Sequence, residues 1–128
     1  MDKDPIRLAV ITGQHPFEVP PFVRLFRSLQ HVDAYPQDLE NYVADLGHVR
    51  GWYDVVLFYN MHAEPPRGGA EVLQALGERE QGLVILHHGM LAFGDWPVWD
   101  EIVGIADRRF TYKAGEAVPV AIADPDHP

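Results

Sequence analysis

The sequence contains no cysteine, and this absence removes several kinds of chemistry at once. Without a thiol the chain forms no disulfide, carries no thiolate nucleophile and offers no cysteine ligand to zinc. Serine is nearly absent as well, because Ser28 is the only one and it falls within an expected helix. A hydrolase with a serine–histidine–aspartate triad is therefore not expected.

Positive charge is also scarce in this sequence. Ten Lys and Arg stand against nineteen Asp and Glu, so the net charge is −9 with neutral histidine. Nucleic acids and anionic membranes bind surfaces of positive potential, and we expect neither as a partner. No apolar run approaches the roughly 20 residues of a membrane span, and "MDKDPIRLAV" lacks the features of a signal peptide. We expect a cytoplasmic protein.

The chain has the size and the hydrophobic content of one domain. Of its 128 residues 47% are hydrophobic, which is enough for one sizeable core. Two ordinary domains would need a longer chain, and we treat residues 1–128 as a single domain.

Short apolar runs alternate with amphipathic segments along the chain. Runs without polar alternation are typical of strands buried on both faces, and they predict strands at 6–12, 53–60, 82–87 and 117–124. A weaker strand is expected at 31–36, and a short strand or extended segment at 108–113. Apolar side chains at helical spacing predict helices at 20–31, 36–47, 70–81 and 97–104. Gly47 is expected to end the second helix, and Asp95 to cap the last.

This alternation predicts the fold class. Strands that alternate with helices indicate an α/β protein, a three-layer sandwich with a mainly parallel, flavodoxin-like sheet. Right-handed crossovers favour the strand order 2-1-3-4-5. Because no helix is expected after the last strand, one face of the sheet is predicted to be bare unless a partner or a further segment covers it.

Histidine follows four of the five main expected strands. In a parallel sheet, ligands bind beyond the carboxyl ends of the strands, so these side chains are predicted to share one edge. They are His15, His62, His87, His88 and His127, whereas His31 and His48 fall elsewhere. A structural interpretation stays open, because polar residues gather at strand ends and a buried histidine often donates to a backbone carbonyl.

The adjacent pair His87 and His88 is the strongest candidate in the chain. In "GLVILHHGMLAF" a buried strand runs into two histidines and a glycine. A strand that turns sharply into a helix pushes the turn residue into a cleft, as nucleophile elbows do. We expect one of the two imidazoles to face the site and the other to pack behind it. Imidazole exchanges protons near neutral pH or binds a metal through one nitrogen.

Other residues near these strand ends are candidates for binding. Gln14 and Asn60 can donate to and accept from a polyhydroxylated ligand, and Trp96 can stack on a sugar face, while Trp99 is expected in the core. A divalent metal such as zinc or nickel is an open alternative, with an acid from the set Glu18, Asp95 and Asp126. The sequence has neither a GxGxxG nor an HExxH motif, and no metal ligand is assigned.

Several blocks together resemble one known family. The blocks are "RLAVITGQHPFE", "YDVVLFYNMH", "GLVILHHGMLAFGDWPVWDEIVG" with Phe110 after it, and "DPDHP". In this order they are similar to the blocks of ThuA-like (trehalose utilisation) domains. The resemblance implies a class I glutamine amidotransferase-like fold and a place in carbohydrate metabolism, including trehalose and keto-sugar derivatives. It also implies that His87 is the family's strand-four histidine, His15 its strand-one histidine and His127 the histidine of its "HP" segment.

The chain departs from this family in three places. The elbow cysteine of the amidotransferase superfamily has no counterpart, so the resemblance implies a protein that is not a glutaminase. The glycine run before strand four is reduced to Gln81-Gly82. Family members continue past "HP", which implies that this chain is a shortened member or that a partner subunit completes its site.

The leading hypothesis from the sequence is a carbohydrate-active protein that uses no cofactor. Its cleft is expected to contain Gln14, His15, Asn60, His62, His87, His88, Trp96 and His127. His87 is the expected general acid or base, with His15 and His88 beside it. Two alternatives stay open: a non-enzymatic module that binds a ligand or a partner, as a homodimer for example, and a metal-dependent hydrolase.

Overall fold

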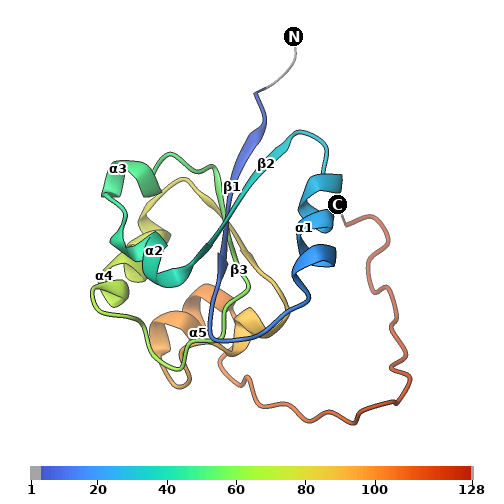
Figure 1. Ribbon diagram of the computed structural model, residues 1–128. Coiled ribbons are helices and arrows are strands. Elements are labelled where there is room, and N and C mark those ends of the chain that lie inside the picture. The colour runs from blue at the N-terminus through green and yellow to red at the C-terminus, as the bar shows by residue number, and fades with distance from the viewer. Residues whose placement is uncertain (1–3, 128) are drawn as a thin grey trace.

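Four parallel strands form the centre of the protein, whose computed structural model describes residues 4–127 (Figure 1). They are β1 (Ile6–Thr12), β2 (Val32–Asp38), β3 (Val55–Phe58) and β4 (Gly82–Ile85), in the order β2-β1-β3-β4. Ile11, Phe58 and Ile85 stand side by side in the register, so three strands end at one edge. The predicted α/β class with a parallel sheet is confirmed, and these four strands follow the predicted order.

Helices lie on both faces of this sheet. Five are α-helices and two are 3₁₀ segments: α1 (Val19–Ser28), α2 (Leu39–Ala44), α3 (Gly47–Arg50), α4 (Gly69–Gln74), η1 (Ala75–Glu78), η2 (His87–Leu91) and α5 (Pro97–Val103). Side chains alternate along a strand, so β1 sends Ala9 and Ile11 to one face and Leu8 and Val10 to the other. This explains why β1 is apolar throughout.

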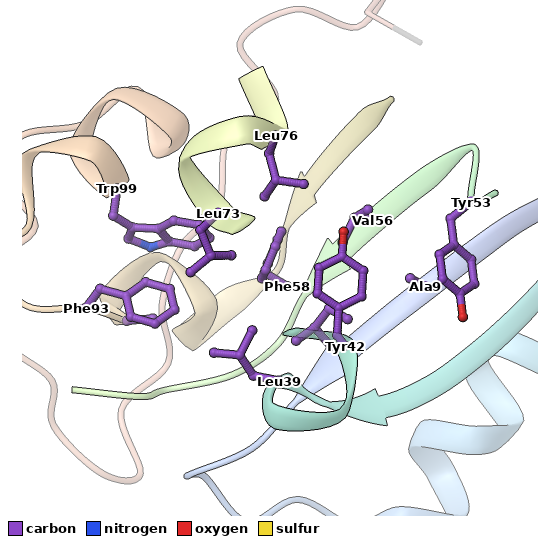
Figure 2. Packing of buried hydrophobic residues seen from close by; sticks show 12 residues of the cluster. Ala9, Leu39, Tyr42, Tyr53, Val56, Phe58, Leu73, Leu76, Phe93 and Trp99 are labelled. Carbon is purple, nitrogen blue, oxygen red and sulfur yellow. The ribbon is translucent and has the colours of Figure 1, made fainter. Parts of the chain in front are cut away.

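The larger core lies beneath α2, α4 and α5. Figure 2 shows Trp99 of α5 with Phe93, Leu73 and Phe58 around it. The Trp99 ring is fully buried, its centroid lies 5.0 Å from that of Phe58, and its Nε1–H donates to Gly89 O. Trp99 is therefore a core residue, as the sequence predicts.

The second face of the sheet is covered by α1 alone. Phe22 and Phe26 of α1 pack on Leu8, Val10 and Leu57. Among residues 4–127 no second helix packs beside α1 over β4, and Val84 of β4 is 42% exposed. The structure thus leaves part of one face uncovered, at the side of β4.

The predicted fifth strand is wrong. Residues 104–127 contain no helix and no strand in the structure, and Val120 is 87% exposed. We call this segment the C-terminal arm. Residues 117–124 have the composition of a strand, but a strand exists only where a second backbone pairs with it, and Pro119 lacks an N–H. Residues 108–113, expected as a short strand or an extended segment, form no strand. The predicted buried strand at 82–87 is a half-exposed edge strand, β4.

Several helix boundaries also differ from the predictions. The first helix ends at Ser28 instead of residue 31, and α4 ends at Gln74, followed by η1 to Glu78, instead of reaching residue 81. The helix expected to reach Gly47 ends at Ala44, and Gly47 begins α3 instead of stopping α2. At the other end, β2 continues to Asp38, whose side chain accepts from Asn41 N–H at 2.8 Å and so begins α2 later than residue 36; Asp45 is extended and ends it. Asp95 does not cap α5; the N-cap is Trp96, and Pro97 occupies the first turn.

Candidate functional site

Three histidines meet at the carboxyl edge of the sheet. His15 follows β1, and His87 and His88 follow β4. The rings of His15 and His88 are stacked, with centroids 3.9 Å apart and an interplanar angle of 20°. The ring of His87 stands edge-on to that of His88, at 5.4 Å and 83°. We call these three side chains the imidazole stack.

Unusual backbone geometry places these rings. Gly13 and Gln14 have φ of 132° and 58°, and His87 has φ of 51°, in the left-handed region that L residues seldom adopt. Gly89 approaches β3 so closely that a Cβ atom there would lie 2.4 Å from Phe58 O. The turn after β4 therefore requires glycine, and the strained conformation of His87 is typical of functional turns.

Hydrogen bonds determine which ring nitrogens carry protons. His88 Nε2 lies 3.1 Å from Tyr59 O, and a carbonyl only accepts, so this nitrogen is protonated. In neutral His88 the Nδ1 atom is then an acceptor, and the Nδ1–H of His87 donates to it at 3.3 Å. His15 Nδ1 donates likewise to Pro16 O at 2.7 Å. In their neutral forms, His15 and His87 consequently each have an unprotonated Nε2.

The surroundings disfavour a positive charge on His88. Burial lowers its pKa, and neighbouring His15 and His87 lower it further, while the hydrogen bond to Tyr59 opposes them. His87 is exposed, whereas His88 is buried. The arrangement therefore presents His87 to solvent as the ring able to exchange protons, with a neutral acceptor behind it.

His62 forms a second group of side chains with Glu40 and Asn60, separate from the imidazole stack. Its Nε2 donates to Glu40 Oε1 at 2.9 Å, and its Nδ1 accepts from Asn60 Nδ2 at 3.2 Å. Burial alone would raise the pKa of Glu40, but the hydrogen bonds it accepts, first of all from His62, outweigh burial and lower this pKa. Asn60 and His62 are enclosed by protein in this structure rather than presented at the surface.

Glu40 was missed by the sequence analysis. The signal was present, because Glu40 comes directly after β2 and so lies at the same carboxyl edge as the histidines. Ending the second strand at Pro36 instead of Asp38 hid this position.

The other predicted residues are more scattered. Gln14 is exposed beside His15 in the first turn. Trp96 is half-buried, with its ring edge-on to Phe93 at 5.8 Å. His127 lies near the end of the exposed C-terminal arm, and the strand that was expected to bring it to the sheet edge is absent. The place of His127 in the cleft therefore stays a prediction.

Arg108 was not predicted from the sequence either. Its side chain binds the loop that follows His87 and His88. Its buried guanidinium pairs with Asp100 at 2.7 Å and donates to Met90 O and Ala92 O, each at 2.8 Å. It donates to Gly94 O as well. Arg108 thus joins the start of the C-terminal arm to the segment between η2 and α5.

A metal site does not emerge from the described part of the chain. Within residues 4–127, no group of three or more His, Asp or Glu side chains has the arrangement to hold a metal ion. Glu18, Asp95 and Asp126 do not complete such a group. The alternative of a metal-dependent hydrolase therefore lacks a ligand set here.

Comparisons with models of protein families, with curated proteins and with solved structures give no match to this chain. The resemblance to ThuA-like domains accordingly stays a prediction. Among residues 4–127, no helix has both the length and the apolar character needed to cross a membrane.

Proposed function

We propose that the imidazole stack binds a small polyhydroxylated or carbonyl ligand, and that His87 transfers a proton to or from it. One observation carries this proposal: exposed His87 stands on a left-handed turn with its Nδ1 held by His88. Its Nε2 is thereby available to a ligand. The resemblance to ThuA-like domains in a class I glutamine amidotransferase-like fold favours a sugar or keto-sugar related to trehalose as that ligand.

The proton transfer follows from the hydrogen-bond chain. A ligand hydroxyl gives its proton to His87 Nε2, and the new imidazolium donates through Nδ1 to neutral His88. The lowered pKa of His88 keeps this acceptor unprotonated when His87 becomes charged. A histidine placed in this way typically accelerates a reaction by roughly 10²–10⁴-fold. His15 and Gln14, which adjoin in the turn after β1, supply further contacts for hydroxyl groups.

The test is ligand binding followed by NMR of the imidazole groups. Trehalose and keto-sugar derivatives are titrated into the protein, and we expect shifts at His15, His87 and His88. His87→Gln should weaken binding at least tenfold, since the accepting Nε2 is lost. His48→Gln is the matched control, because His48 lies exposed in α3. Absence of any shift at millimolar ligand contradicts the proposal.

The second candidate function is a non-enzymatic module that binds a partner or a second copy of the chain. Exposed apolar side chains favour it, namely Val84 on β4 and Tyr112, Val118, Val120 and Ile122 on the C-terminal arm. Light scattering after gel filtration separates the two candidates, because this function requires a dimer or a partner complex. A cytoplasmic location stays a prediction under either function.

A further inference from the structure

The Glu40–His62–Asn60 assembly is not used by the proton transfer described above, yet it touches the turn that carries His15. A Cβ atom added to Gly13 would lie 2.5 Å from His62 Cε1. The imidazole of His62 therefore rests directly on the backbone of that turn. Met61, its neighbour in the chain, donates its N–H to Gly13 O at 2.9 Å.

The same segment also contacts the loop that begins with His87 and His88. His62 O accepts from Phe93 N–H at 2.6 Å, and Phe93 has a left-handed φ of 59°. Left-handed residues persist only where their surroundings hold them. Residues 61 and 62 thus join the strained turn after β1 to a second strained turn at Phe93, which follows η2.

The ring of His62 is itself held at both nitrogens. Glu40 Oε1 accepts from Nε2, and Asn60 Nδ2 donates to Nδ1, so rotation of the ring breaks two hydrogen bonds. Asn60 is fully buried, and its Oδ1 has no hydrogen-bond partner. A buried amide oxygen without a partner is unfavourable, so the hydrogen bond from Asn60 Nδ2 to His62 is formed at a cost in free energy.

We propose that Glu40 and His62 are positioning residues for the imidazole stack. Glu40 fixes the ring of His62, and His62 holds the turn of His15 against Phe93, at the end of the η2 segment that begins with His87 and His88. The catalytic value of this positioning rests on the proposed function. The positioning itself is a property of the ligand-free protein and is measured there.

Two substitutions at Glu40 separate contact from charge. Glu40→Gln loses the charge but keeps an oxygen that accepts from His62 Nε2. Glu40→Asp keeps the charge but is one methylene too short for the 2.9 Å contact. The Glu40 side chain is 52% exposed, so both variants should fold, and circular dichroism checks this. Glu64→Gln, at an exposed position in the loop after β3, is the control.

The readout is the upfield shift that stacking produces in the ring protons of His15 and His88. We expect Glu40→Asp to move these signals toward the positions of unstacked imidazole, and Glu40→Gln and Glu64→Gln to leave them in place. Unchanged signals in folded Glu40→Asp overturn the proposal. So does loss of stacking in Glu40→Gln alone, because charge rather than contact would then be responsible.

Ligand titration of the same variants distinguishes this proposal from the proposed function. With a ligand that binds, Glu40→Asp should weaken binding or turnover roughly 10- to 100-fold, as expected when reacting groups are misplaced by about 1 Å. Should no sugar bind even the unmodified protein, the proposed function fails, while the ring-proton shifts still decide whether Glu40 positions the stack.

Discussion

The two histidine assemblies at the sheet edge use the same side chain in opposite electrostatic settings. In the imidazole stack, His88 is buried between two other histidines, and its pKa is lowered. In the second assembly, His62 faces Glu40, and the pKa of that carboxyl group is lowered. In one setting the surroundings oppose positive charge on the imidazole, and in the other the imidazole donates a hydrogen bond to a carboxylate. Both histidines follow a strand, so position in the sequence does not reveal which setting a histidine enters.

Gly89→Ala should give the largest loss of stability. It disturbs the turn that carries His87 and His88, and it leaves the Glu40–His62 assembly untouched. The added Cβ meets Phe58 O at 2.4 Å, and backbone cannot move aside as a flexible side chain does. We expect a loss of about 3 kcal/mol in the free energy of unfolding, measured in urea. Gly77→Ala is the control, since nothing lies within 4 Å of its new Cβ. Equal stabilities for the two variants would show that the turn is loosely packed.

Arg108→Ala should give the next largest loss of stability. It too affects the segment that follows His87 and His88, and it leaves the Glu40–His62 assembly untouched. It leaves Asp100 and the carbonyls of Met90 and Ala92 without their shared donor. We expect a loss of about 2 kcal/mol in the free energy of unfolding and faster hydrogen exchange in the loop that follows His88. Arg109→Ala is the matched control, because Arg109 pairs with Asp107 on the exposed surface. A similar loss in both variants contradicts the role given to Arg108.

The pH dependence of stability should differ between the two assemblies. The folded-state pKa of His88 lies below its ordinary value of 6.5, so the unfolded chain binds more protons once the pH falls below 6.5. Stability contributed by neutral His88 is therefore complete above pH 6.5 and declines below it. His88→Gln should reduce the fall in melting temperature as the pH is lowered below 6.5, measured by thermal unfolding at a series of pH values. If His88→Gln has the same pH dependence of melting temperature as the unmodified protein, another group is responsible for it.

Glu40 should produce the smallest effect, at lower pH. Its folded-state pKa lies below the ordinary value of 4.5, so its stabilising contribution is complete above 4.5 and is lost as the pH falls through the folded value. Half of the side chain is exposed, and solvent screening keeps the contribution small. Glu40→Gln should change the melting curve below pH 4.5 and leave the region near 6.5 as it was.

Much of the fold could be predicted from local patterns. The apolar run of β1 and the proline at the start of α5 both match the structure, since each depends on neighbouring residues alone. The expected meeting of His15, His87 and His88 at one edge follows from parallel strands ending together. The fifth strand failed because a strand needs a partner that the pattern at 117–124 does not specify.

The sequence by itself determined the alternation of strands and helices, the absence of thiol chemistry and the placement of histidine after β1, β3 and β4. Only the tertiary structure decided that His88 stacks on His15 while His62 turns to Glu40. The reason is physical: a ring's charge and proton positions depend on burial and on partners distant in the chain. Glu40 and His62, 22 residues apart, meet only because β2 and β3 lie on either side of β1.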